Sequence, residues 1–532
     1  MKKLSFLLLL CLARTAFAQY DPQVVTPVYT GGNTYRGVNN LYFSATLGSR
    51  LFFNVQLEDS FELYMTDGTA ANTLKLKTLP QVLNMAAFDN NVYFSFGDPV
   101  NGTELWKTDG TLAGTVSVST LGSNSTAATQ FTVSGSKMYF VAGNSASPNS
   151  PQLYILEAGS NTPQLLRNDL YEVSNLTALN GKIYFSASDT APNIYNRELY
   201  TTDGTVAGTI RVKDIWSGTG DSNPQNFKVY HNKLYFSAND GTHGREVWTS
   251  DGIESGTKLL KDINSGSGDA FYGFNSGVYN GKLYFAASDG VNAGAMWVTD
   301  GTPGGTEPVK VFNTAGSSGV SGFVEVNGKM IVTANDGTHG FELWVSDGTA
   351  QNTTLLKDIN PGQNSANYAV YATKGGCGNV LFFDGDSGAN NVEPWVTNGT
   401  EAGTYQIKDI HPTEGSLDYE TRYVQLGSKI YFSARLPTGR QLFSMNADCT
   451  LNVNENPAAA IRVYPNPAHE FINISCPTDI RTVEIYNSAG QKLLNMSGNQ
   501  KQVDVRQLTA GIYIIKITTG NGKAFSTKII KK

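Results

Sequence analysis

Residues 234–252 read LYFSANDGTHGREVWTSDG, and this stretch decides the fold. Its two halves alternate apolar with polar residues, are rich in aromatic and β-branched side chains, and end in Asn, Asp or Gly. Such a pattern predicts two short β-strands joined by a loop at Gly241–Arg245. FKVY at 227–230 and KLLKDI at 258–263 add a strand on either side. Four antiparallel strands in 40 to 50 residues are typical of a β-propeller blade, whose ring arrangement hides the sheet edges.

The same unit recurs along the chain, which predicts a repeat-built all-β propeller of eight or nine blades. The spacing between equivalent Asp residues of successive copies doubles once, from Asp109 to Asp203. The degenerate copy QLYILEAG at 152–159 lies in this interval. A ninth unit ends in QLFSMNAD at 441–448. The seven clear copies are ELYMTDGT at 62–69, ELWKTDGT at 104–111, ELYTTDGT at 198–205, EVWTSDG at 246–252, MWVTDGT at 296–302, ELWVSDGT at 342–349 and EPWVTNGT at 393–400.

The two ends of this body are expected to meet. The ninth unit lacks an obvious fourth strand, whereas residues 24–29 form a spare strand with no unit of their own. We therefore expect residues 24–29 to pair with the last unit and close the ring.

The first 18 residues resemble a secretory signal peptide: Lys2 and Lys3 precede the apolar run 4–12, and Ala16–Ala18 forms an A-x-A cleavage site. The run is shorter than the roughly 20 residues that span a bilayer, which disfavours a transmembrane anchor. Cys11 leaves a lipoprotein as the minor alternative, because Leu10 stands where a small residue is preferred.

Charge and cysteine content exclude some classes of protein. Loss of Lys2, Lys3 and Arg14 with the signal peptide changes the formal charge from -6 to -9, so nucleic acid is not an expected partner. Three cysteines then remain, too few and too scattered for a disulfide framework. They are Cys377, Cys449 and Cys476.

The character of the chain changes after a polar linker at 452–461. Residues 462–532 hold ten Lys and Arg against four Asp and Glu, so this region carries +6 and the body about -15. Six or seven strands in about seventy residues predict a small β-sandwich.

Two resemblances follow from these phrases. The repeated phrase resembles the ELWxxDGT repeat family of secreted Bacteroidetes-type proteins over residues 41–451, which implies an extracellular propeller and little about chemistry. VYPNPAHEFINI at 463, IYNSAGQKLL at 485 and LTAGIYIIKI at 508 resemble the type IX secretion sorting domain. That resemblance implies secretion or attachment at the outer cell surface after passage through the periplasm, with the type IX machinery as partner. An ordinary β-sandwich accessory domain is the alternative.

The recurring Asp residues are candidates for calcium, which needs 6 to 8 oxygen ligands. One Asp per turn supplies too few, so we favour a structural role in which Asp caps the turn and Gly takes a positive φ. No other cofactor is expected. The candidates are Asp67, Asp109, Asp203, Asp251, Asp300 and Asp347, with Asn398 in the seventh copy.

The recurring Glu and Trp invite a glycosidase interpretation, but a hydrolase uses one specific carboxylate pair. Repetition instead predicts packing between blades. His243 and His339 share the phrase NDGTHG and lack metal-ligand spacing, so loop positions are expected. The sequence thus favours a non-catalytic protein that binds a glycan or protein through propeller loops and a central channel. The alternative is a carbohydrate-active hydrolase or lyase with a site built from unique loop residues.

Overall fold

The computed structural model describes residues 20–532 except 34, 40, 99–101, 122–127, 144–149, 191–195, 272–274, 367–372, 375–378, 389–390, 412, 418–420, 448–461, 465–466, 477–478, 488–490 and 521–523. The expected signal peptide and linker lie outside these residues. The described part is all-β, and none of it forms a helix with the length and apolar character needed to cross a membrane. The chain divides into two compact units, Met1–Cys449 and Thr450–Lys532.

Seven sheets of the first unit have four antiparallel strands each, in the order of the chain. They form units two to eight of the repeat. Their strands are β7 Leu83–Phe88, β8 Asn91–Asp98, β9 Gly102–Thr108 and β10 Val116–Thr120; β11 Thr129–Ser134, β12 Lys137–Ala142, β13 Gln152–Glu157 and β14 Gln164–Leu165; β15 Tyr171–Leu179, β16 Lys182–Ser188, β17 Glu198–Thr202 and β18 Ile210–Lys213; β19 Gln225–Tyr230, β20 Lys233–Asn239, β21 Arg245–Ser250 and β22 Lys258–Lys261; β23 Ser276–Tyr279, β24 Lys282–Ala287, β25 Ala295–Thr299 and β26 Glu307–Lys310; β27 Ser321–Val326, β28 Lys329–Asn335, β29 Phe341–Ser346 and β30 Thr354–Lys357; β31 Thr373–Lys374, β32 Leu381–Asp386, β33 Val392–Thr397 and β34 Tyr405–Gln406.

Units one and nine are joined in a single nine-stranded sheet. β2 joins them, because it pairs with β4 of unit one and with β37 of unit nine. β1 pairs antiparallel with β37, with Gln23 opposite Ser444. The strands are β1 Gln23–Val24, β2 Gly37–Val38, β3 Ala45–Leu47, β4 Arg50–Gln56, β5 Phe61–Thr66, β6 Leu74–Leu79, β35 Val424–Leu426, β36 Lys429–Leu436 and β37 Gly439–Asn446.

This pairing confirms that the start of the body joins the last unit, although the strand is shorter than expected. Beyond Val24 the segment is held by other contacts. The Val25 N–H donates to Leu442 O at 2.9 Å. The side-chain amide of Gln441 accepts the Val28 N–H at 3.1 Å and donates to Tyr29 O at 2.6 Å. We call residues 20–30 the strap.

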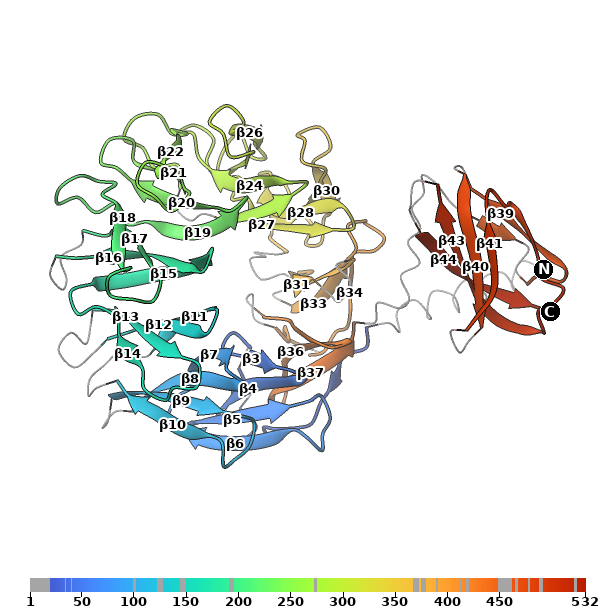
Figure 1. The fold of residues 1–532 in the computed structure, drawn as a ribbon, viewed down its shortest axis with the longest axis horizontal. Coiled ribbons are helices and arrows are strands. Elements are labelled where there is room, and N and C mark those ends of the chain that lie inside the picture. The colour runs from blue at the N-terminus through green and yellow to red at the C-terminus, as the bar shows by residue number, and fades with distance from the viewer. Residues whose placement is uncertain are drawn as a thin grey trace. The chain divides into compact units, whose positions relative to one another are not determined.

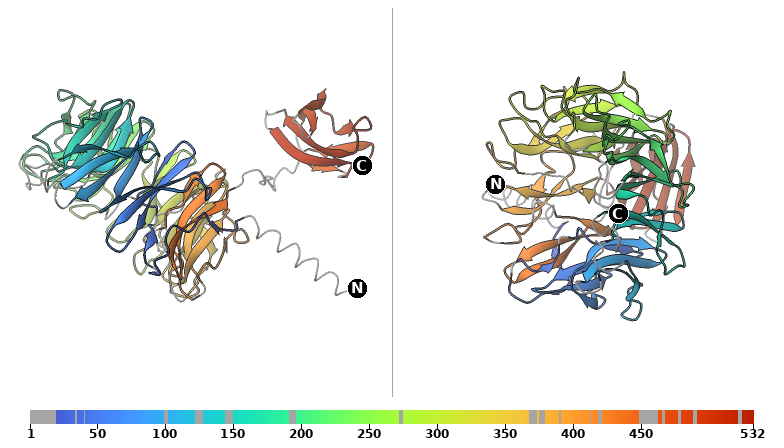
Figure 2. Two further views of the ribbon diagram at one scale, coloured as in Figure 1. Left: turned by 90° about the horizontal axis from the view of Figure 1, so that it is seen from below. Right: turned by 90° about the vertical axis from the view of Figure 1, so that its left-hand side faces the viewer.

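The apolar core lies between units. Each of nine buried clusters joins two consecutive units, and one of them joins unit nine to unit one. In that cluster Tyr431 and Leu442 pack with Phe53 and Val55. The described residues therefore form a closed ring of nine blades (Figure 1), and both views of Figure 2 place the blue strands of unit one beside the orange strands of unit nine.

The second unit is a small β-sandwich with its own core, in which Ile485 and Ile515 are fully buried. One sheet has the order β38-β39-β42 and the other β41-β40-β43-β44. The strands are β38 Arg462–Tyr464, β39 Phe471–Ser475, β40 Ile480–Asn487, β41 Lys492–Ser497, β42 Gln502–Asp504, β43 Gly511–Thr519 and β44 Ala524–Lys531.

Candidate functional site

The repeated TDGT phrase forms the hairpin turn before the outermost strand, and its polar atoms bond within the turn. The Asp109 Oδ1 atom accepts hydrogen bonds from the Thr111 amide and hydroxyl, both at 2.8 Å. The hydroxyls of Thr108 and Thr115 lie 2.8 Å apart and clamp the two strands. Gly110 has φ +94°, which L side chains rarely adopt. The predicted role of Asp and Gly as turn residues is thus confirmed in this unit, and Asp67, Asp203, Asp300, Asp347 and Asn398 make the same pair of bonds.

The Gly of the phrase also serves the contact between blades. A Cβ built at Gly252 would collide with the hydroxyl of Tyr184, which belongs to the preceding unit. Gly204, Gly301 and Gly348 face the preceding unit's Tyr in the same way, and Gly68 of unit one faces Tyr431 of unit nine. In these five units the turn therefore receives a phenol ring from the neighbouring blade, whereas Gly110 meets Arg50 and Gly399 meets Ile331.

Nothing in this geometry supports calcium at the turns. Asp251 keeps only the bond from the backbone amide of residue 253, at 3.2 Å, because Ile253 replaces the Thr and has no hydroxyl to donate. Among the described residues, no group of three or more His, Cys, Asp or Glu side chains is placed to hold a metal ion. The calcium candidates stay an untested prediction.

The recurring Glu is a buried latch for the chain that crosses to the next blade. The carboxylate of Glu246 is fully buried and accepts the amides of Ile263 and Asn264, each at 2.9 Å. Glu198, Glu342 and Glu393 accept the amides found 17 and 18 residues further on in the same way. The Trp two residues after Glu246, Trp248, packs in the cluster between units four and five. Repetition at these positions thus reflects packing, as expected.

Other units fill the latch position differently. Glu62 and Glu104 are partly exposed and accept the Tyr64 hydroxyl and the Trp106 indole N–H. In unit six, where the position holds Ala295, the Ser318 hydroxyl accepts the two crossing amides. In unit nine, Gln441 holds the strap. The strap therefore occupies the place that the crossing chain takes in other blades.

We expect Glu246→Gln to destabilise the body by about 1–3 kcal/mol, because the Gln amide would set an N–H₂ group against a backbone N–H. Thermal unfolding of the variant measures this loss. Glu254→Gln is the matched control, since Glu254 lies exposed in a turn of the same unit. Equal melting temperatures for the two variants would contradict the latch.

Burial raises the pKa of Glu198, Glu246 and Glu342 to about 7, although their backbone donors offset part of the effect. A raised folded-state pKa means that the stabilisation is complete below the ordinary Glu pKa and is lost as pH rises through the folded value. The body should therefore melt at a higher temperature at about pH 5 than at about pH 8. A variant with Gln at these three positions should show a flatter pH profile; an unchanged slope would contradict the assignment.

His243 and His339 hold their own loops. The Nδ1 atom of each lies 2.8 Å from the Oδ2 atom of the Asp three residues earlier, and this hydrogen bond raises the pKa of both imidazoles. In unit six Asn292 makes the equivalent bond to Asp289, at 2.9 Å. Since Asn replaces His there, the bond needs only a short polar donor.

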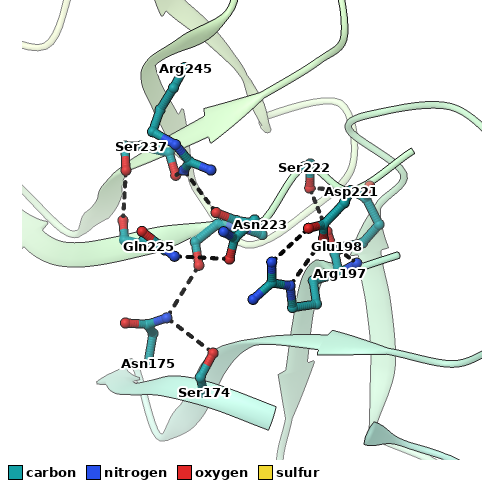
Figure 3. A network of polar contacts seen from close by, with 11 residues as sticks. Ser174, Asn175, Arg197, Glu198, Asp221, Ser222, Asn223, Gln225, Ser237 and Arg245 are labelled. Atoms are coloured by element: carbon teal, nitrogen blue, oxygen red, sulfur yellow. Dashed lines mark hydrogen bonds and ion pairs between the residues drawn. The ribbon is translucent and has the colours of Figure 1, made fainter. Parts of the chain in front are cut away.

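Polar side chains outside the repeated phrase gather where units four and five meet (Figure 3). We call this set the 4/5 seam: Asn175 on β15, Arg197 before β17, Asp221 and Asn223 in the connection to β19, Gln225 on β19 and Arg245 on β21.

Hydrogen bonds join the seam across the two blades. The Arg197 guanidinium binds Asp221 through two bonds, at 2.6 and 3.0 Å. The Gln225 amide donates to Asn223 Oδ1 at 3.0 Å, and the Asn175 amide donates to Pro224 O at 3.4 Å. All of these residues are only partly buried.

Trp216 lies beside the seam and is the only Trp outside the repeated phrase. Its indole packs so closely on Gly220 and Gly241 that neither position has room for a side chain. Asn264 and Asn360 take the corresponding place in units five and seven. The backbone N–H of each donates to the latch Glu of its unit. Sequence reasoning did not single out this seam; the signal available was Arg before Glu in two adjacent units.

The C-terminal unit can be assigned to a known class. Residues 462–532 match the family described as the secretion system C-terminal sorting domain. The chain is thus an all-β propeller followed by a type IX sorting domain, and it is secreted or lies at the outer cell surface.

Curated relatives match only part of the chain. An endo-acting ulvan lyase of Formosa agariphila is 28% identical over 163 residues, which are 28% of this chain and 32% of the lyase. An ulvan lyase of Nonlabens ulvanivorans is 27% identical over 131 residues, 23% of this chain and 24% of that enzyme. The chain therefore spans no more than a third of either relative.

Solved structures give weak similarity. The β-propeller domain of the trilobed protease from Pyrococcus furiosus is 12% identical, with a TM-score of 0.31, over 61% of this chain and 99% of that domain. PorZ, a surface component of the type IX system of Porphyromonas gingivalis, is 12% identical with a TM-score of 0.25, over 92% of this chain and 81% of PorZ. The assignment of the fold depends on the nine blades themselves.

Proposed function

We propose that the chain is a non-catalytic binding protein of the ELWxxDGT repeat type, which presents the loops of a nine-bladed propeller to an extracellular glycan or protein. Residues 1–18 are its signal peptide, 19–451 the propeller, 452–461 a linker and 462–532 the sorting domain. One observation carries the proposal: the recurring side chains suited to catalysis are committed to the fold, with Glu on backbone amides, Asp on its own turn and His on its own Asp. Ligand contact is left to the non-repeated groups.

A glycan array and pull-downs with the full secreted chain test this proposal. Specific capture of a ligand that is recovered unchanged supports it. Absence of any ligand, or chemical conversion of the ligand, contradicts it.

The second candidate is a carbohydrate-active hydrolase or lyase on the propeller. The partial similarity to two ulvan lyases favours it. Incubation with ulvan, followed by analysis of the products by size, separates the two candidates: shorter products would establish the enzyme, and intact polymer would remove it for this substrate.

Export through the sorting domain has a direct test. Cells that produce the chain without residues 462–532 should hold the body inside the outer membrane, whereas the full chain reaches the surface or the medium. Equal fractionation of the two would contradict the partnership with the type IX machinery.

A further inference from the structure

Two arginines at the 4/5 seam occupy equivalent positions but have different partners. Arg197 and Arg245 each precede a latch Glu, and the amide of each donates to an Asp 24 residues further on, Asp221 or Asp269. The Arg197 guanidinium also binds Asp221 in an ion pair of 2.6 Å. The Arg245 guanidinium makes no ion pair with any described carboxylate.

Arg245 turns instead toward the connection before β19 and toward β20 of its own blade. Its Nη1 atom donates to the carbonyl oxygens of Asn223 and Ser237, at 2.9 and 3.4 Å. Figure 3 shows this guanidinium at Asn223 and the guanidinium of Arg197 at Asp221. A cation bonded only to neutral carbonyls keeps unused donors in the planar arrangement that suits a carboxylate.

The Arg245 guanidinium is partly buried and has no carboxylate in direct contact among the described residues. Burial lowers the pKa of Arg245; the negative charges of Asp269 and Asp221 oppose this effect, and the positive charge of Arg197 adds to it. A partly buried cation gains more from binding an anion than a solvent-exposed cation does, because less water must be removed from the buried cation. The gain is largest for a bidentate carboxylate.

Beside the Arg197–Asp221 ion pair and Arg245, the seam holds neutral groups that carry both donors and acceptors. Asn175, Asn223 and Gln225 supply amides, and Ser174 beside Asn175 supplies a hydroxyl (Figure 3). Such groups match the hydroxyls of a sugar ring, whereas they offer no apolar contact for the side chains of a peptide. With one unpaired guanidinium, the seam suits one carboxylate at a time.

We propose that the 4/5 seam binds a uronate residue of an extracellular polysaccharide, with Arg245 holding its carboxylate and the amides of Asn175 and Gln225 contacting its hydroxyls. This inference rests on the proposed binding function and names its ligand class.

Titration calorimetry of the full secreted chain with an oligogalacturonate tests the inference. We expect binding that weakens about 10- to 100-fold in Arg245→Gln, because a charge-assisted bond is lost. The methyl ester of the same oligosaccharide should bind as weakly. Arg211→Gln is the control, since Arg211 lies exposed on the outermost strand and pairs with Asp214 at 3.8 Å. This control should bind as the parent does.

Asp269→Asn provides a test in the opposite direction. The Oδ1 atom of the new amide can still accept the Arg245 amide N–H, so the loop keeps its bond while a competing negative charge disappears. The oligogalacturonate should bind this variant more tightly, a result that no loss of folding can imitate. The Asp269→Asn variant also decides the matter if Arg245→Gln does not fold.

Three results would overturn the inference: equal binding of acid and ester, unchanged binding in folded Arg245→Gln, or weaker binding in Asp269→Asn. Tighter binding of polyglutamate than of oligogalacturonate would assign the seam to acidic peptides instead. A glycan-array ligand whose binding survives Arg245→Gln would overturn this inference and leave the proposed function standing. Absence of every ligand from the array would contradict the proposed function itself.

Discussion

Gly252→Ala should lower the melting temperature of the body far more than Gly266→Ala does. Both residues have nearly the same backbone conformation, with φ +97° and +96°, so both substitutions strain the chain by about 1 kcal/mol. Only at position 252 does the new methyl group collide with Tyr184 of the neighbouring blade. Overpacking of this kind costs about 1–3 kcal/mol more. Thermal unfolding of both variants measures the difference.

A double variant identifies the contact. Tyr184→Phe removes the hydroxyl that meets the new methyl group at position 252, so it should restore part of the stability lost in Gly252→Ala. In the Gly266→Ala background, where no atom lies within 4 Å of the new methyl group, the same change should restore nothing. Equal losses for the two single variants would mean that the recurring turn does not receive its neighbour's ring.

Deletion of the strap, residues 20–30, should lower the melting temperature by roughly 10 °C or more, the scale expected when several kcal/mol are lost from a large domain. The deletion removes the β1–β37 pairing and the buried rings of Tyr20 and Tyr29. Tyr20 packs edge-on against Phe382 with centroids 5.3 Å apart. The deletion also leaves the buried Gln441 amide without its partners, which adds a desolvation cost.

Gln23→Ala serves as the control, because Gln23 is exposed and its backbone pairing survives the substitution. Gln441→Leu tests the latch of unit nine alone and should cost less than the deletion. An unchanged melting temperature after deletion would indicate that the nine blades are stable as an open array.

The sequence was sufficient for the blades because their signals are local. In LYFSAND and EVWTS the alternation of side chains, and the Gly and Asp that follow, act within a few residues, so the structure agrees. The strap was harder to predict. Its expected strand ends at Val24, because Pro27 has no N–H for a ladder and the Gln441 side chain takes over the pairing.

The site could be predicted only as far as repetition reaches. Recurrence suggested that Glu246 is structural, but its partners lie 17 and 18 residues away and no local pattern shows them. Arg197 and Arg245 have nearly identical neighbours in sequence, yet one is paired and the other is not. That difference depends on how adjacent blades meet.

The contact between the strap and Gln441 spans 412 residues of chain. The strap is therefore among the last segments to find its place, since unit nine must exist before Tyr29 has a partner. Contacts of such sequence separation slow folding. Closure of the ring therefore requires the strap and unit nine to be present in the same compartment.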